Sequence, residues 1–350
     1  MSHRRIVATI VVSAAMALWA SVMFTRAVHG RPIGPFEFLA RTVPLCENDL
    51  QALKAGEPIA TEIPSSTQNE LSLFGAVRVD TPLHSYLAVT RNPLFFETEM
   101  VQAWGRFSDP PREEDLAGLT WPEEDLEALP GCRTGNCKIK LPPGYLDQLE
   151  PLVGEKTRFA ARANALLRRT IVDYLNRYRE HGNAALLEYQ DKQQPVSIAK
   201  EFDGILENFA PLSLYTPDLT GYLKNYPGNQ PPNIQNRFIW AKVLLGGKAK
   251  RPIIFLYHMI TYQIPGGNDT AVVLKQIYAS HYYEAALGFT LMAADPENKS
   301  RFYLLHFDRG RIDILRHIPA FLCYGFRGDT RVILARRLEE IREQTKIRYR

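Results

Sequence analysis

The stretch RPIIFLYHMITYQIPGGNDTAVVLKQIYASHYYEAALGFTLMAADPEN, residues 251–298, decides the fold of this chain. Its long runs of β-branched and aromatic residues are separated by groups of Pro, Gly, Asn and Asp, a pattern typical of strands joined by hairpin turns. With its flanks it predicts an antiparallel meander of four segments: 237–245, 252–264, 271–294 and 301–308. Strands of this length twist, so we expect a curved sheet that wraps around another element.

The rest of the chain adds two strands and several helices. Residues 71–80 have strand composition and lead into a helix, and a short strand is expected at 100–107. The segment 112–230 predicts a large helical insert. The chain is expected to end in an amphipathic helix at 329–346, with Asp329 as its N-cap. The predicted fold class is therefore α+β.

This order of elements resembles the helix-grip fold of the START and polyketide-cyclase-like superfamily. The sequence LFGAVRVDTP (73–82) looks like its first strand and turn, and 300–350 looks like its last strand and gripped helix, within a domain of 71–350. The insert at 112–230 is larger than usual. The resemblance implies an apolar cavity between sheet and C-terminal helix, for a lipid, sterol, polyketide or other hydrophobic ligand, and no shared catalytic residue. The chain is also similar to a family of uncharacterised bacterial exported proteins in three segments: 105–111, 276–284 and 303–311.

The first 30 residues predict a signal anchor. Residues 6–24 carry no charge and no proline, and as a helix they would be about 28 Å long, close to the hydrocarbon thickness of a bilayer. The short N-terminal side is easily kept in the cytoplasm, so we expect a body that faces the periplasm or the outside. The alternative is secretion after cleavage near Gly30. Residues 31–70 are expected to be a linker with a short helix at 47–55.

Composition excludes several classes of function. The 350 residues are 45% hydrophobic and 23% charged, with a net charge of +4, as in an ordinary globular protein. Four N-terminal arginines account for that charge, so the body is close to neutral and no nucleic-acid partner is expected: Arg4, Arg5, Arg26 and Arg31. The chain has no phosphate loop, dinucleotide fingerprint or Gly-x-Ser-x-Gly elbow, which disfavours ATP, NAD and serine-hydrolase chemistry.

Four cysteines fit an oxidising compartment. Cys132 and Cys137 flank a short loop that can reverse tightly, which predicts a local disulfide. A zinc site would need two further ligands nearby, so no metal and no cofactor are expected. Cys46 and Cys323 are either free or paired with each other.

The candidate site residues gather midway along the third segment of the meander, where a bulge or bend is expected: Tyr278, His281, Tyr283 and Glu284. His281 and Glu284, near His258, could form an acid/base pair or hold a metal ion. His306 and Asp308 of an adjacent strand could join them. The competing interpretation is structural: His281 and Glu284 satisfy each other or the backbone at a strand break.

Arg309 and Arg311 could recognise a carboxylate or phosphate headgroup through forked hydrogen bonds, or could form ordinary surface ion pairs. The sequence thus favours a membrane-anchored protein, held through residues 6–24, that binds an apolar or amphipathic small molecule without catalysis. One alternative is an enzyme that uses His281 and Glu284. The other is an envelope scaffold whose cavity is filled by its own side chains.

Overall fold

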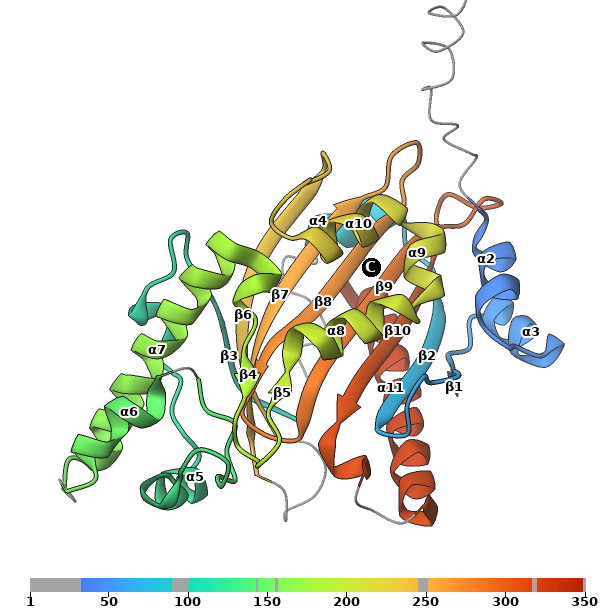
Figure 1. Cartoon of the computed structure of the whole chain (residues 1–350). Helices are drawn as coiled ribbons and strands as arrows, with labels where there is room; N and C mark the ends of the chain where they lie inside the picture. The colour runs from blue at the N-terminus through green and yellow to red at the C-terminus, as the bar shows by residue number, and fades with distance from the viewer. Residues whose placement is uncertain are drawn as a thin grey trace, which may run out of the picture. The chain divides into compact units, whose positions relative to one another are not determined.

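The computed structural model describes residues 33–89, 100–142, 144–154, 157–244, 251–316 and 320–348. Residues 34–350 form one compact unit. The unit from residue 34 onward is α+β and is built on a large antiparallel sheet, as the sequence predicts (Figure 1).

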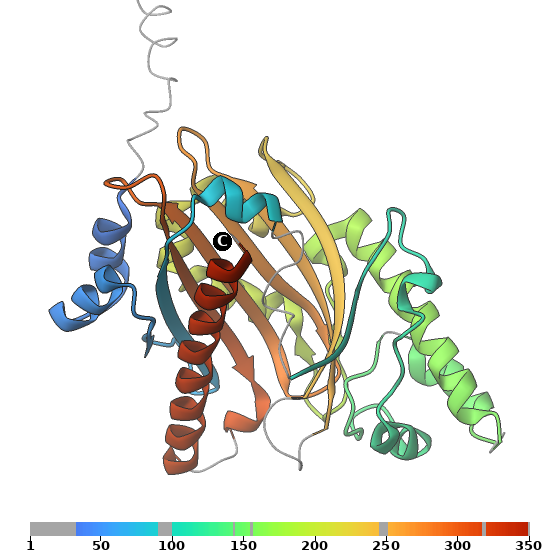
Figure 2. The same ribbon diagram turned by 180° about the vertical axis from the view of Figure 1, so that it is seen from behind.

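Eight strands form this sheet in the order β1-β2-β10-β9-β8-β7-β6-β3, and every neighbouring pair is antiparallel. They are β1 Ile59–Glu62, β2 Glu70–Val79, β3 Val101–Arg106, β6 Ile234–Val243, β7 Ile253–Gln263, β8 Thr270–Ala279, β9 Tyr283–Ala294 and β10 Phe302–Ile312. The predicted meander forms the contiguous stretch from β6 to β10, and the sheet curves (Figure 2). Two further short strands, β4 Glu188–Tyr189 and β5 Val196–Ser197, pair with each other.

The third predicted segment of the meander is two strands and not one. The chain reverses between β8 and β9 at residues 280–282, where Tyr282 adopts a left-handed backbone conformation with φ of 59°. The sequence has no Gly or Pro at this point, so the usual chemistry of a turn is missing. The expected bend at the polar cluster is therefore a complete hairpin reversal.

The helices surround the sheet. They are α2 Pro35–Thr42, α3 Glu47–Ala55, α4 Leu83–Val89, α5 Glu123–Ala128, α6 Tyr145–Leu149, α7 Phe159–His181, α8 Ile198–Glu207, α9 Ala210–Tyr215, α10 Pro217–Asn225 and α11 Ala320–Arg348, with 3-10 turns at Glu113–Leu116, Leu129–Gly131, Glu150–Leu152, Gly182–Ala185 and Asp313–Arg316. The predicted insert supplies α5 to α10. Gly182 ends α7 with a positive φ of 58°, as expected of a glycine after a helix.

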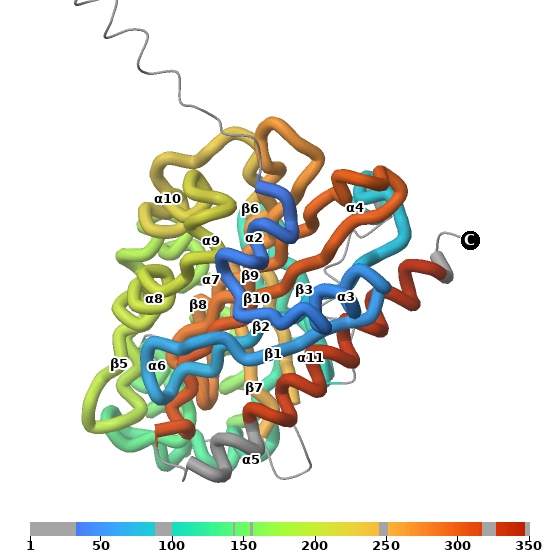
Figure 3. The backbone as a smooth tube through the Cα atoms, turned by 90° about the vertical axis from the view of Figure 1, so that its right-hand side faces the viewer, coloured from blue at the N-terminus to red at the C-terminus, as the bar shows by residue number. Residues whose placement is uncertain are grey.

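The two faces of the sheet carry different helices. Successive residues of a strand point to opposite faces. On β10, Leu304 packs in one cluster with Leu338 of α11, whereas Phe307 packs on Phe209 at the start of α9. We call these the α11 face and the insert face. Figure 3 shows the sheet between α8, α9 and α10 on one side and α11 on the other.

The expected linker 31–70 is largely part of the fold. Its predicted helix is α3, but α2 also packs on the sheet unit, where Phe38 is buried against Tyr215 and Phe307 at ring distances of 4.9 and 5.9 Å. β1 adds an edge strand to β2. The prolines that suggested a linker instead begin and separate short elements, because proline is well tolerated in the first turn of a helix.

Two expectations concern the ends of the chain. The C-terminal helix starts at Ala320, nine residues before the predicted cap, so Asp329 lies within α11 and does not cap it. The predicted anchor, residues 6–24, lies outside the described residues. Among the helices that are described, none is both long and apolar enough to cross a bilayer.

Candidate functional site

Accessible side chains cross the middle of the α11 face. By strand register, Leu274 of β8, Gly288 of β9 and Asp308 of β10 lie side by side on this face. They belong to a group that keeps solvent exposure although it lies on central strands. We call this group the Asp308 strip: Tyr257, Leu274, Tyr283, Gly288, His306 and Asp308.

The members of the strip are close neighbours. A Cβ atom placed on Gly288 would lie 3.7 Å from Leu274 Cβ, 3.7 Å from His306 Cε1 and 4.0 Å from Asp308 Oδ1. These are ordinary van der Waals distances, so the glycine leaves a space for a small group at the centre of the strip.

Helix α11 runs beside this strip. It packs on β1 and β2, and a Cβ at Gly75 of β2 would lie 2.7 Å from Leu338 and 2.9 Å from Leu334. The glycine thus lets the helix approach the edge of the sheet closely. Figure 2 shows α11 running along one side of this face of the sheet. The central strands next to the helix carry partly exposed side chains. The strip is therefore bordered on one side by the C-terminal helix.

Asp308 carries a charge that no described residue compensates. Among the described residues it has no hydrogen-bond or ion-pair partner. Its side chain is exposed by surface area, yet burial raises its pKa to about 6. Both observations hold where water reaches a carboxylate from one direction while protein occupies the others. Because the Asp308 carboxylate retains part of its hydration, its ionisation destabilises the folded state by less than the full pKa shift implies.

The polar groups around Asp308 are neutral near pH 7. Burial lowers the pKa of His306 to about 4, and its Nδ1 atom lies 2.9 Å from Thr290 Oγ1. Burial raises the pKa of Tyr257 and Tyr283, and the Asp308 carboxylate raises both further. The ring of Phe255 lies 5.3 Å from each tyrosine ring. The strip therefore joins one carboxylate acceptor to an aromatic and aliphatic surface, which can hold a molecule with a polar donor and an apolar body.

Two of the predicted site residues lie on the other face of the sheet. His258 is fully buried, with Nδ1 3.1 Å from Tyr178 Oη and Nε2 2.8 Å from Asn236 Oδ1, and burial depresses its pKa well below the ordinary value. Tyr278 is also fully buried and donates to the Lys140 carbonyl at 2.6 Å. Both act as core residues under the insert.

His281 and Glu284 do not contact each other as an acid/base pair. His281 lies in the β8–β9 turn, with Nε2 2.8 Å from Asp125 Oδ2, and Asp125 also pairs with Arg251 at 3.2 Å. Glu284 accepts from Arg316 at 2.8 Å and from Asn69 at 2.9 Å.

His258 is also distant from this turn. It faces Lys275 across β7 and β8, six residues before His281, which corresponds to roughly 20 Å along a strand. His258, His281 and Glu284 thus belong to three separate networks.

Arg309 and Arg311 are committed to buried ion pairs on the insert face. Arg309 Nε lies 3.1 Å from Glu70 and also donates to Ser72, and Arg309 contacts two backbone carbonyls. Arg311 pairs with Glu201 of α8 at 2.7 Å. They fasten the insert to the sheet and are not placed to receive a headgroup on the α11 face.

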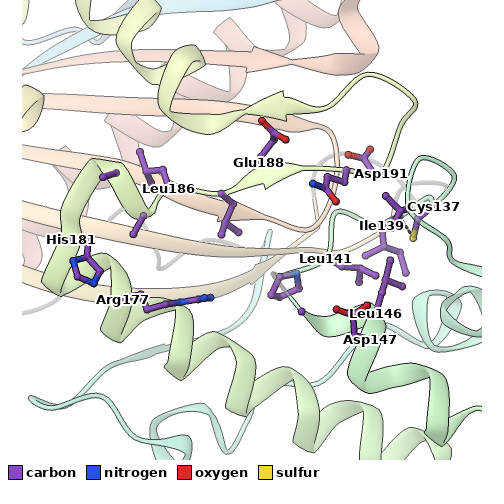
Figure 4. A pocket seen from close by; sticks show the side chains of 17 residues that line it. Cys137, Ile139, Leu141, Leu146, Asp147, Arg177, His181, Leu186, Glu188 and Asp191 are labelled. Atoms are coloured by element: carbon purple, nitrogen blue, oxygen red, sulfur yellow. Dashed lines mark hydrogen bonds between the residues drawn. The ribbon is translucent and has the colours of Figure 1, made fainter.

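The predicted disulfide between Cys132 and Cys137 is present, and Cys46 has a free, exposed thiol. The side chain of Cys323 lies outside the described ones. Beside the disulfide, an open groove of about 780 Å³ runs between α6, α7 and β4 (Figure 4). Of its lining residues, Arg177, His181, Glu188 and Asp147 are exposed, whereas the Asp191 side chain is mostly buried and pairs with Lys140 at 3.5 Å. No group of His, Cys, Asp or Glu side chains suited to a metal ion occurs in the part of the chain that is described.

Sequence reasoning located one member of the strip, Tyr283, as a site residue and named His306 and Asp308 only as possible neighbours of His281. The signal that could have found them is the pair of polar residues two apart within the apolar alternation of β10, which places both on one face.

These features define an α+β protein with a curved antiparallel sheet, a C-terminal helix along one face and a carboxylate on an apolar strip beside that helix. Comparison with protein-family models, with curated proteins and with solved structures returned no match.

Proposed function

We propose that this protein is a membrane-anchored, extracytoplasmic binder of an apolar or amphipathic small molecule, which it holds on the Asp308 strip without changing it chemically. The observation that carries the proposal is an accessible aromatic and aliphatic strip around a carboxylate that has no partner among the described residues. A carboxylate that costs stability and has no partner among the described residues is typical of a binding site.

The position of the strip supports a helix-grip interpretation of the fold. That resemblance implied a ligand between the sheet and the C-terminal helix, and the strip lies beside α11 on the face that the helix covers in part. The disulfide between Cys132 and Cys137 supports an oxidising compartment. An export anchor at residues 6–24 agrees with that compartment.

The experiment is photolabelling of the full chain in lipid nanodiscs with dodecanol that carries a diazirine. Mass spectrometry of the peptides should place the label on β7 to β10. A Gly288→Leu variant tests the site, because its Cβ fits at 3.7 Å from its neighbours while the rest of the side chain fills the strip. We expect labelling of these strands to fall about tenfold, as for loss of a well-filled apolar contact.

Gly221→Leu is the matched control. It adds the same side chain on α10, where a Cβ has no neighbour within 4 Å, and it should leave labelling unchanged. Label spread evenly over the chain, or equal labelling of the Gly288→Leu variant and the parent, would contradict binding on the strip.

A further inference from the structure

Asp308 differs from three other carboxylates of the sheet in whether a positively charged side chain lies beside it. Glu70, Glu284 and Asp313 are each buried and each lie within 3.2 Å of an arginine or lysine nitrogen. Asp308 has no cation at such a distance among the described residues. Among the described residues, these three buried carboxylates are therefore compensated on the insert face, whereas Asp308 has no compensating cation on the α11 face.

Among the described residues, no group that faces Asp308 supplies a compensating positive charge. His306 on the same strand is neutral near pH 7, and Tyr257 and Tyr283 are uncharged. On α11, Leu334 lies against Gly75, which pairs with His306 of the strip. Arg337 of the same helix pairs with Glu340 at 2.8 Å through Nη1, and its Nε and Nη2 atoms are buried without a hydrogen-bond partner in the described part of the chain. At neutral pH the strip thus presents a net negative charge to its occupant.

The tyrosine rings beside the Asp308 carboxylate also favour a positively charged group. A Cβ on Gly310 would lie 3.3 Å from the Tyr283 ring, so this tyrosine extends along β10 toward Asp308. The Asp308 carboxylate contributes to raising the pKa of both Tyr257 and Tyr283, so the three side chains lie close together. Aromatic faces attract cations, most strongly where water is partly excluded. A carboxylate next to tyrosine rings is a combination that selects positive charge.

We propose that the ligand of this strip is an amphiphile with a basic amine, whose ammonium group pairs with Asp308 between the tyrosines while its apolar chain lies over Leu274 and its neighbours. The inference rests on the proposed function and specifies its ligand class. A hydroxyl headgroup would leave the carboxylate uncompensated, and an acidic headgroup would be repelled by it.

The test compares three photoreactive probes with the same dodecyl chain on the full protein in nanodiscs: dodecylamine, dodecanol and dodecyl sulfate. We expect the strip to take up the amine about 10- to 100-fold more tightly than the sulfate, the range that charge-assisted hydrogen bonds give. Asp308→Asn should remove this preference, and the ratio of amine to sulfate uptake within the variant is the readout. Asp295→Asn, at the other end of β9 and paired with Arg301, should keep it.

Each outcome separates the two proposals. Equal uptake of amine and sulfate, or an amine preference that persists in Asp308→Asn, overturns the amine proposal while dodecanol labelling still supports a binding strip. Absence of dodecanol label from β7 to β10 refutes both. Circular dichroism of each variant verifies that it is folded.

Discussion

The Asp308→Asn substitution is expected to stabilise the folded chain at neutral pH. In the folded protein the pKa of this carboxyl is raised to about 6, whereas an Asp in an unfolded chain titrates near about 3.9. Between these values the folded state binds more protons than the unfolded state, so the parent loses stability as the pH rises through this window. Asn has no charge to desolvate and avoids that loss.

The magnitude follows from the pKa shift. About two pH units correspond to an upper value of about 3 kcal/mol. Because the side chain is exposed, water screens part of this cost, and we expect a gain of about 1 kcal/mol at pH 7.5. The gain should be mostly absent at pH 4, where the folded carboxyl is protonated. Urea unfolding followed by circular dichroism at both pH values measures it.

Asp295→Asn is the control with the opposite sign. Burial acts to raise the pKa of Asp295, but hydrogen bonds from the Glu297 backbone and the Arg301 side chain lower it overall. This substitution should destabilise the protein at pH 7.5. A destabilised Asp308→Asn variant, or a gain of equal size at pH 7.5 and pH 4, would refute the assignment of Asp308 as an uncompensated carboxylate.

Three further predictions use the same unfolding assay. Burial depresses the pKa of Lys275 far below its ordinary value, so the folded state binds fewer protons: Lys275→Met should add about 1 kcal/mol at pH 7, and the gain should shrink toward pH 10. Joint replacement of Cys132 and Cys137 by Ser should cost about 2 kcal/mol by releasing the loop in the unfolded chain, and no loss under oxidising conditions would contradict it. Gly182→Ala should cost about 2 to 4 kcal/mol, because its Cβ would lie 1.8 Å from the Tyr226 carbonyl oxygen at φ of 58°; a stability equal to the parent's would count against this geometry.

The meander was predictable because strand composition and turn residues coincide along most of residues 237–308. The prediction was wrong at residues 280–282, where the chain reverses at Tyr282 although no glycine is present. The polar cluster around it looked like one site because its members are adjacent in sequence. In the fold, the turn sends Tyr283 to the α11 face, whereas Glu284 pairs with Arg316 and Asn69.

The sidedness of β7 could not be read from sequence, because both of its faces are apolar and aromatic. The two faces differ only in what packs on them. On one face, His258 contacts Tyr178 of α7, and on the other face Tyr257 is partly exposed. That covering depends on contacts between segments far apart in the chain, which periodicity does not encode.

Sequence alone also does not reveal that Asp308 lacks a charged partner among the described residues. Next to it in sequence stands Arg309, so a count of charges treats the pair as balanced. The pleat of β10 places the two side chains on opposite faces, and Arg309 forms an ion pair with Glu70 beneath the insert. Neutrality along the chain thus becomes a charge separation across the sheet. It is this separation, and not the number of polar residues in any segment, that leaves a carboxylate beside α11 without a charged partner among the described residues.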